Sequence, residues 1–170
     1  MDLVANNLSY KPDDQYHLNE VSFNFKEGNL YTILGRTLSG KTTLLKTIAG
    51  LLTPDSGEIE FDGKNFLKIP VWERNVAMVY QQFINYPHLN VFENIAFPLK
   101  QRKIDQSIIK EKVMDALKSV GLLGYENRKI QELSGGQQQR VSLARSLVKN
   151  AKILLLCLLY TSPSPRDSDT

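Results

Sequence analysis

The stretch GRTLSGKTT, from Gly35 to Thr43, constrains the fold of this chain more than any other. It follows an apolar run, Leu30 to Leu34, and precedes a segment with helical spacing, Leu44 to Leu52. Strand, glycine-rich turn and helix in this order, with G-x-x-x-x-G-K-T at the bend, are typical of a phosphate-binding loop. Backbone N–H groups and the positive end of the helix bind phosphate oxygens in such a loop. The alternative is a glycine-rich turn that binds nothing.

The loop pattern predicts which residues meet the ligand. Lys41 is expected to reach the β- and γ-phosphates, and Thr42 is expected to place its hydroxyl on Mg²⁺. The other loop residues are expected to line the phosphates: Gly35, Arg36, Thr37, Leu38, Ser39, Gly40 and Thr43.

Length and composition indicate one ordinary globular domain or part of one, with 170 residues of which 42% are hydrophobic. The net charge of +3 is mild, and no basic run is long enough to indicate a nucleic-acid-binding arm. No apolar stretch approaches the roughly 20 residues of a membrane span, and the first residues lack the pattern of a signal peptide. Cys157 is the only cysteine, which excludes a disulfide framework. We therefore expect a cytosolic chain.

Periodicity predicts the remaining elements. Strands are expected at residues 3–10, 16–25, 58–63, 76–80 and 153–156, and helices at 104–120 and 134–149. Gln81 follows the strand at 76–80, and ligands of open α/β sheets sit just beyond strand ends, so Gln81 is a site candidate. A surface glutamine is the alternative. Residues 85–98 are more apolar than a free loop should be, which predicts either an exposed partner surface or a small satellite core.

The helix expected at 134–149 begins with LSGGQ. Ser134 is at the N-cap, Gly135 and Gly136 occupy the first turn, and Gln137 follows. Glycine costs a helix interior about 1 kcal/mol relative to alanine. Two glycines at a helix start allow close backbone approach to an anion. An ordinary helix cap is the alternative.

In this order and at these separations, the phosphate loop, Gln81 and LSGGQ resemble the nucleotide-binding subunits of ABC transporters. The resemblance covers residues 1–156. It implies an α/β fold of the P-loop NTPase type, with a central, mainly parallel sheet, an N-terminal antiparallel β part and a helical subdomain. The Q-loop and this subdomain would occupy about residues 82–132, and the fold would be incomplete at its C-terminus.

Two longer stretches resemble the carbohydrate importers, especially ATPases of the maltose, glycerol and glycerol-3-phosphate type. They run from Arg74 to Leu99 and from Leu133 to Asn150. The phosphate loop departs from the commoner family pattern, because Arg36 replaces a proline and Thr37-Leu38 replaces Ser-Gly. The Thr-Leu pair favours a glycerol-importing branch. The function implied is ATP-driven import of a sugar, polyol or glycerol-phosphate.

The resemblance also implies the mechanism, with ATP and Mg²⁺ as cofactors. Two copies meet head to tail, so that the residues Ser134 to Gln137 of one copy serve the nucleotide on the phosphate loop of the other. Gln81 is expected to act catalytically by sensing Mg²⁺ and the attacking water. Tyr16, which lies 25 residues before Lys41, is expected to stack on adenine, with Tyr10 as the alternative.

The partners implied are a second ATPase subunit and transmembrane permease subunits that dock at Gln81 to Pro98. A substrate-binding protein would act indirectly, and no nucleic acid is expected. The chain would lie peripherally on the cytoplasmic face of a bacterial plasma (inner) membrane. One alternative is a soluble ABC ATPase acting on nucleic acid or ribosomes, although the long insertions of such proteins are missing. A second is an ATP-binding pseudo-subunit.

The C-terminal tail departs from the family pattern, which continues after Leu156 with Asp-Glu-Pro. Cys157 and Leu158 stand there instead, and neither can bind a hard cation or act as a base. We therefore expect the intact parent to hydrolyse ATP and this chain to be inactive. Residues 157–167 resemble one translated frame of the transposase-type adapter of short-read sequencing libraries. We expect residues 157–170 to be a non-native tail, and a chain that stops there to be marginally stable.

Overall fold

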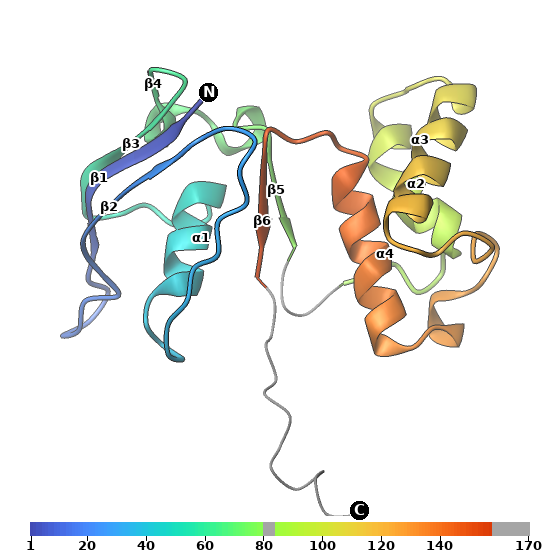
Figure 1. Cartoon of the computed structure of the whole chain (residues 1–170), viewed down its shortest axis with the longest axis horizontal. Coiled ribbons are helices and arrows are strands. Elements are labelled where there is room, and N and C mark those ends of the chain that lie inside the picture. Colours follow the sequence, from blue (N-terminus) through green and yellow to red (C-terminus); the bar gives the residue numbers. More distant parts are fainter. Residues whose placement is uncertain (80–83, 158–170) are drawn as a thin grey trace, which may run out of the picture. The chain divides into compact units, whose positions relative to one another are not determined.

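The computed structural model describes residues 1–79 and 84–157, and Figure 1 traces them. The chain divides between Val76 and Ala77 into two compact units. Within the described ranges, no helix combines the length and the apolar character that crossing a bilayer requires.

The first unit is built on an antiparallel sheet (Figure 1). Its strands are β1 (Leu3–Tyr10), β2 (Leu18–Phe25), β3 (Ser56–Phe61) and β4 (Lys64–Asn65), in the order β2-β1-β3-β4. Leu3, Ala5 and Leu8 of β1 are buried, and so is Ile59 of β3. The pattern fits a sheet that turns one face to a core.

Helix α1 (Lys41–Ala49) follows the phosphate loop, and two short 3-10 helices, η1 (Phe66–Lys68) and η2 (Val71–Glu73), complete the unit. The helix begins three residues earlier than the periodicity predicts, directly after Gly40. It ends at Gly50, whose φ of 81° allows its N–H to return to carbonyls of the last turn.

The prediction of a strand at Leu30 to Leu34 is wrong. These residues belong to no strand of the described chain, and Leu30 and Leu34 are 89% and 87% exposed. An apolar run has the composition of a buried strand, but a strand forms only where a neighbouring backbone accepts and donates hydrogen bonds. Sequence periodicity reports the first condition and not the second.

The second unit combines a short sheet with three helices. β5 (Val76–Val79) and β6 (Ile153–Leu156) form a two-stranded sheet, and their arrows point the same way in Figure 1. The helices are α2 (Val91–Gln101), α3 (Gln106–Ser119) and α4 (Gly135–Leu147), and a 3-10 turn, η3 (Ile130–Glu132), precedes α4. The strands and helices predicted from residue 104 onward are confirmed to within two residues at each end.

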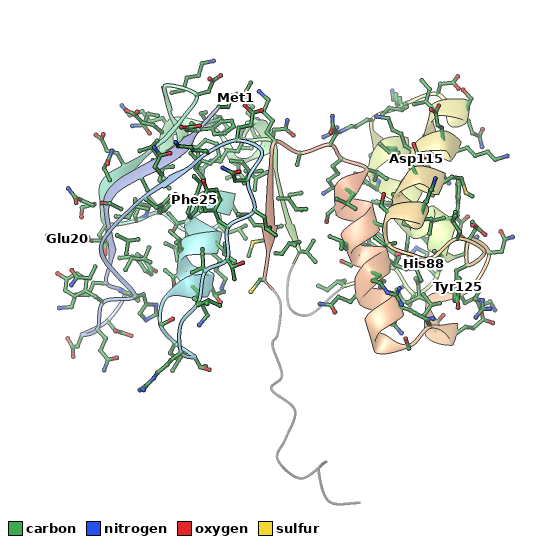
Figure 2. The ribbon with its side chains drawn as sticks, viewed as in Figure 1. Met1, Glu20, Phe25, His88, Asp115 and Tyr125 are labelled. Atoms are coloured by element: carbon green, nitrogen blue, oxygen red, sulfur yellow. The ribbon has the colours of Figure 1, made fainter. Side chains whose placement is uncertain are left out.

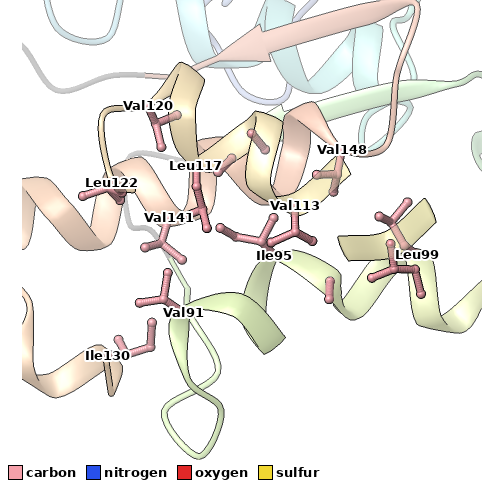
Figure 3. Close-up of a cluster of buried hydrophobic side chains, with 14 of the residues drawn as sticks. Val91, Ile95, Leu99, Val113, Leu117, Val120, Leu122, Ile130, Val141 and Val148 are labelled. Atoms are coloured by element: carbon pink, nitrogen blue, oxygen red, sulfur yellow. The ribbon is translucent and has the colours of Figure 1, made fainter. Parts of the chain in front are cut away.

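The core of this unit lies among the three helices. Figure 3 shows apolar side chains from all three meeting there. The fully buried members, each 1% exposed or less, are Val91, Ile95, Ala96, Leu99, Val113, Leu117, Leu122, Val141 and Ala144. This core fixes α4, and therefore the position of its N-terminus, against α2 and α3.

Helix α2 was not predicted, because residues 85–98 contain turn formers among the apolar residues. Asn90 caps the helix by accepting from Glu93 N, and Glu93 accepts from Asn90 N in return. Pro98 is tolerated near the end of the helix, where only one i→i−4 bond is lost. Most apolar residues of α2 are core residues, whereas Phe97 is half-buried and packs on the Tyr86 ring. The prediction of a satellite core is therefore confirmed for α2, and the prediction of an exposed apolar patch is wrong there.

Candidate functional site

The loop from Gly35 to Gly40 turns tightly into α1. Leu38 and Gly40 have φ values of 65° and 86°, in the left-handed region. Ser39 N donates to Arg36 O at 3.2 Å, and Leu44 N donates to Gly40 O at 2.9 Å. Alternating handedness of this kind directs successive N–H groups to one side of the backbone, which makes a concave site for an anion.

Lys41 lies over this loop. Its Nζ donates to the carbonyl oxygens of Gly35 and Arg36 (2.6 Å for Arg36), and it lies 3.2 Å from Ser39 Oγ. A cation and the positive end of α1 therefore lie together at this loop, and Thr42 and Thr43 follow Lys41 in the first turn of the helix. This donor set fits the phosphate oxygens of a nucleotide.

A metal ion at this loop would take most of its ligands from a bound phosphate and from water. Among the described residues, no three His, Cys, Asp or Glu side chains gather as a metal cluster. Mg²⁺ keeps few protein ligands and takes the rest from phosphate and water. The Thr42 hydroxyl beside bound phosphates fits that pattern.

His17 is a neighbour of the phosphate loop that the sequence did not suggest. Its Nδ1 lies 3.4 Å from Thr43 Oγ1, and its carbonyl oxygen would lie 2.0 Å from a Cβ placed on Gly40. Gly40 is therefore required by its backbone angle and by this close approach, before any ligand is considered. No sequence signal marks His17, because the contact joins two segments through the fold of the unit.

The two candidate adenine-stacking tyrosines lie in different surroundings. Tyr16 is 56% exposed, and Lys11 Nζ lies 5.2 Å from its ring centroid. Tyr10 meets the ring of His17 edge-on, with centroids 6.1 Å apart. Through His17, Tyr10 is connected to the phosphate loop.

The start of α4 is an exposed, capped helix end. Gln137 N donates to Ser134 Oγ at 3.3 Å, and Ser134 N donates to Gln137 Oε1 at 2.9 Å. Gly135 and Gly136 have helical backbone angles, and a Cβ on either would meet nothing within 4 Å. Neither packing nor backbone conformation requires glycine at these positions. The space beside both glycines is open to a ligand or to another chain.

Gln81 lies outside the described residues. The segment that follows it, Ile84 to Asn90, belongs to the second unit and is bound to α4 by hydrogen bonds from Asn85 and Arg145. A cavity of about 570 Å³ opens beside this segment. Its lining comes from this segment, the start of α2 and the chain around the start of η3: Pro87, His88, Leu89, Asn90, Glu93, Asn127, Lys129 and Gln131. His88, which lines it, is labelled in Figure 2.

A family model described as ABC transporter matches residues 18–156. The chain belongs to the ABC transporter family. The match includes the phosphate loop and the start of α4. It ends at the last residue of β6.

Relatives with assigned names agree with this family. The chain is 49% identical over 154 residues to a spermidine/putrescine import ATP-binding protein of Mycoplasma capricolum, covering 91% of this chain and 44% of that protein. The protein of the same name in Acetivibrio thermocellus is 47% identical over 150 residues, covering 88% and 43%. This ABC chain therefore spans less than half the length of these relatives.

Solved structures confirm the P-loop α/β fold. The cbiO1 protein of Clostridium perfringens, part of an ABC transporter complex, has a TM-score of 0.78 at 30% identity, covering 91% of this chain and 64% of that one. The ATP-binding cassette MJ0796, solved as a dimer in a post-hydrolysis state with ADP and phosphate, has a TM-score of 0.77 at 33% identity, covering 91% and 72%. The expected ABC-type fold is therefore confirmed. The narrower resemblance to carbohydrate importers is not supported by the names of the relatives, which are those of spermidine/putrescine import ATP-binding proteins.

Proposed function

We propose that this chain is the ATP-binding part of a subunit that couples ATP binding and hydrolysis to the import of a small solute. The observation that carries the proposal is the geometry of Lys41, whose Nζ lies over the concave backbone of the phosphate loop at the start of α1. In this proposal, Gly35 to Thr43 bind the phosphates of ATP, and Thr42 holds Mg²⁺ with them.

The test is ATP binding by equilibrium dialysis in the presence of Mg²⁺. Substitution Lys41→Ala is expected to weaken binding about tenfold or more, since a charge-assisted contact to phosphate is lost. Lys46→Ala is the matched control, because Lys46 lies in the last turn of the same helix. Equal affinity in the Lys41 variant and the unchanged chain would contradict the proposal.

The start of α4 serves a nucleotide held by a second copy of the subunit. The support is its exposure and the open space around Gly135 and Gly136. MJ0796 was solved as a dimer with ADP and phosphate bound, which supports pairing of two copies. The intact subunit is expected to dimerise with ATP in size-exclusion chromatography. Failure to do so with ATP bound would contradict this part.

The permease subunits dock at Gln81 to Pro98, on the cytoplasmic face of a bacterial plasma membrane. Within that range α2 buries most of its apolar residues, so we expect the contact to be concentrated on Ile84 to Asn90 and the adjoining cavity. Ile84 is 74% exposed and His88 is exposed. A cysteine at His88 is expected to cross-link to a permease, whereas a cysteine at the exposed Lys110 of α3 is the control.

Hydrolysis in the parent needs groups beyond those that this chain supplies. Gln81 is proposed to sense Mg²⁺ and the attacking water, and the acidic pair expected after Leu156 is proposed to activate that water. Measurable Mg²⁺-dependent turnover by the 170-residue chain would contradict this assignment.

Two classes of solute remain candidates. The named relatives, at 47% to 49% identity, favour a polyamine. Thr37-Leu38 in the phosphate loop favours a polyol such as glycerol, or a sugar or glycerol-phosphate. Thermal unfolding of the binding protein that works with this importer tests the two classes. Only the solute that the protein binds, a polyamine or a polyol, is expected to raise its melting temperature.

A further inference from the structure

A polar cluster around one buried asparagine fastens the segment Ile84 to Asn90 to the helices α2 and α4. Its centre is Asn94 of α2, which has no exposed surface. Asn94 Oδ1 accepts from Tyr86 N at 2.8 Å. Asn94 Nδ2 donates to the carbonyl oxygens of Tyr86, Leu89 and Asn90 at 3.0, 3.1 and 2.9 Å. One amide side chain therefore binds the segment from its third residue to its last.

Arg145 of α4 joins the cluster from the other side. It donates to Asn94 Oδ1 at 3.4 Å and to the carbonyl oxygen of Ile84, and its guanidinium carbon lies 5.0 Å from the Tyr86 ring centroid. Burial lowers the pKa of Arg145. A partly buried cation is retained where acceptors and a ring compensate for the lost water. Apart from Ser142 Oγ on α4 itself, 3.4 Å away, the acceptors and the ring come from the segment or from Asn94.

These polar contacts are distinct from the packing that holds the helices together. The apolar core of Figure 3 joins α2, α3 and α4 through side chains such as Ile95 and Val141. Apolar residues at positions 94 and 145 would serve that packing without the cost of a buried amide and a partly buried charge. What the polar pair adds is a fixed position for the segment.

A third contact lies nearer the start of α4. Asn85 Nδ2 donates to Gln138 O at 2.8 Å, in the first turn of the helix. The segment is therefore bound to α4 at two positions along the helix, at Gln138 one turn after Ser134 and at Arg145. Two attachments along one helix prevent the segment from pivoting about either of them.

We propose that Asn94 and Arg145 are positioning residues that make the segment Ile84 to Asn90 and α4 move as one body. The proposal rests on the proposed function, in which the segment meets the permease and the start of α4 meets the second copy's nucleotide. A displacement of the segment by the permease then displaces Ser134. The link is a rigid element shared by two sites, which is a physical route for coupling.

The first test measures amide hydrogen exchange in the unchanged chain and its variants. In Arg145→Met and Asn94→Leu, the Tyr86 amide is expected to exchange about tenfold faster or more, the factor equivalent to about 1.4 kcal/mol. The Leu122 amide, which donates to Leu117 O, reports the helical core and is expected to stay protected. Arg140→Met is the matched control, because Arg140 lies on the same helix and donates to Val120 O.

The exchange result can overturn the proposal in two ways. Unchanged protection of Tyr86 in Arg145→Met would show that the cluster does not hold the segment. Equal loss of protection at Tyr86 and Leu122 in Arg145→Met would show that the cluster serves general stability. If Asn94→Leu unfolds, Arg145→Met decides.

The second test uses the intact subunit assembled with its permease. The measured quantity is the ratio of solute-stimulated to basal ATP hydrolysis. The ratio is expected to fall towards one in Arg145→Met, to recover in part in Arg145→Lys, and to stay unchanged in Arg140→Met. Absence of stimulation in the unchanged subunit would count against the proposed function. Stimulation of equal ratio in the unchanged subunit and in Arg145→Met would count against the positioning role alone.

Discussion

Replacement of Gly136 by alanine tests whether this glycine serves the chain itself or a partner. The residue lies in the first turn of α4 with helical angles, and its added Cβ meets nothing within 4 Å. The methyl group therefore adds no strain, and it removes conformational freedom from the unfolded chain. Glycine costs a helix interior about 0.5–1 kcal/mol relative to alanine, so the variant is expected to be more stable by up to that amount.

The assay is urea unfolding followed by far-UV circular dichroism, which reports mainly the helices. With a slope of about 1–3 kcal/mol per molar urea, a gain of about 0.5–1 kcal/mol raises the midpoint by about 0.2–1 M. A lower midpoint would refute the reasoning, because it would show that packing or backbone conformation requires glycine here.

The functional half of this prediction has the opposite sign. In the intact subunit, the methyl group of Gly136→Ala would stand between the helix start and the second copy's phosphates. ATP-dependent dimerisation and hydrolysis are therefore expected to fall, although the fold is more stable. Gly121→Ala offers a comparison, because Gly121 has a φ of 66° and its Cβ would approach only Arg140 at 3.6 Å. That variant is expected to lose stability without a specific loss of dimerisation.

Three further predictions concern other positions. Gly40→Ala is expected to lower stability by about 2 kcal/mol or more, because a left-handed backbone and a Cβ 2.0 Å from the His17 carbonyl oxygen both oppose it; unfolding without nucleotide measures this, and an unchanged midpoint would contradict it. Arg74→Met is expected to cost about 2–4 kcal/mol in the first unit, because the buried guanidinium donates to four carbonyl oxygens; tryptophan fluorescence of Trp72 during unfolding measures this, with Lys68→Met as control. In the genomic locus, the codons after Leu156 are expected to encode Asp-Glu-Pro, and one continuous read that gives Cys-Leu-Leu instead would contradict the adapter hypothesis.

Residue patterns within a few positions of each other were enough to predict α4 and the phosphate loop from the sequence. Ser134 with Gln137 is a capping pair, and the glycine spacing before Lys41 is itself the loop. The same local chemistry marked the start of α2 at Asn90, but the surrounding turn formers hid it. Asn94 could not have been assigned a role, because its partner Arg145 is 51 residues away and the contact depends on how α2 packs on α4.

The error at Leu30 to Leu34 has the same physical origin. Composition reports that a segment prefers burial, whereas pairing depends on a strand that other parts of the chain must supply. The antiparallel strands β1 and β2 were predicted correctly because a short turn joins them, so that their pairing is local. Sequence reasoning is therefore strongest where both partners of a contact lie within a few residues.

Arg74 and Arg145 illustrate how a structural arginine differs from a positioning one. Both are desolvated, which lowers the pKa of each, and both donate to backbone carbonyls. The acceptors of Arg74 are carbonyl oxygens at the end of α1 and in or just after η1, which belong to the fixed frame of the first unit. Beyond Ser142 Oγ on its own helix, the acceptors of Arg145 are Asn94 and the segment that begins at Ile84, which carries the proposed docking surface. Loss of Arg74 should therefore lower the stability of a whole unit, whereas loss of Arg145 should release one segment and leave the core intact.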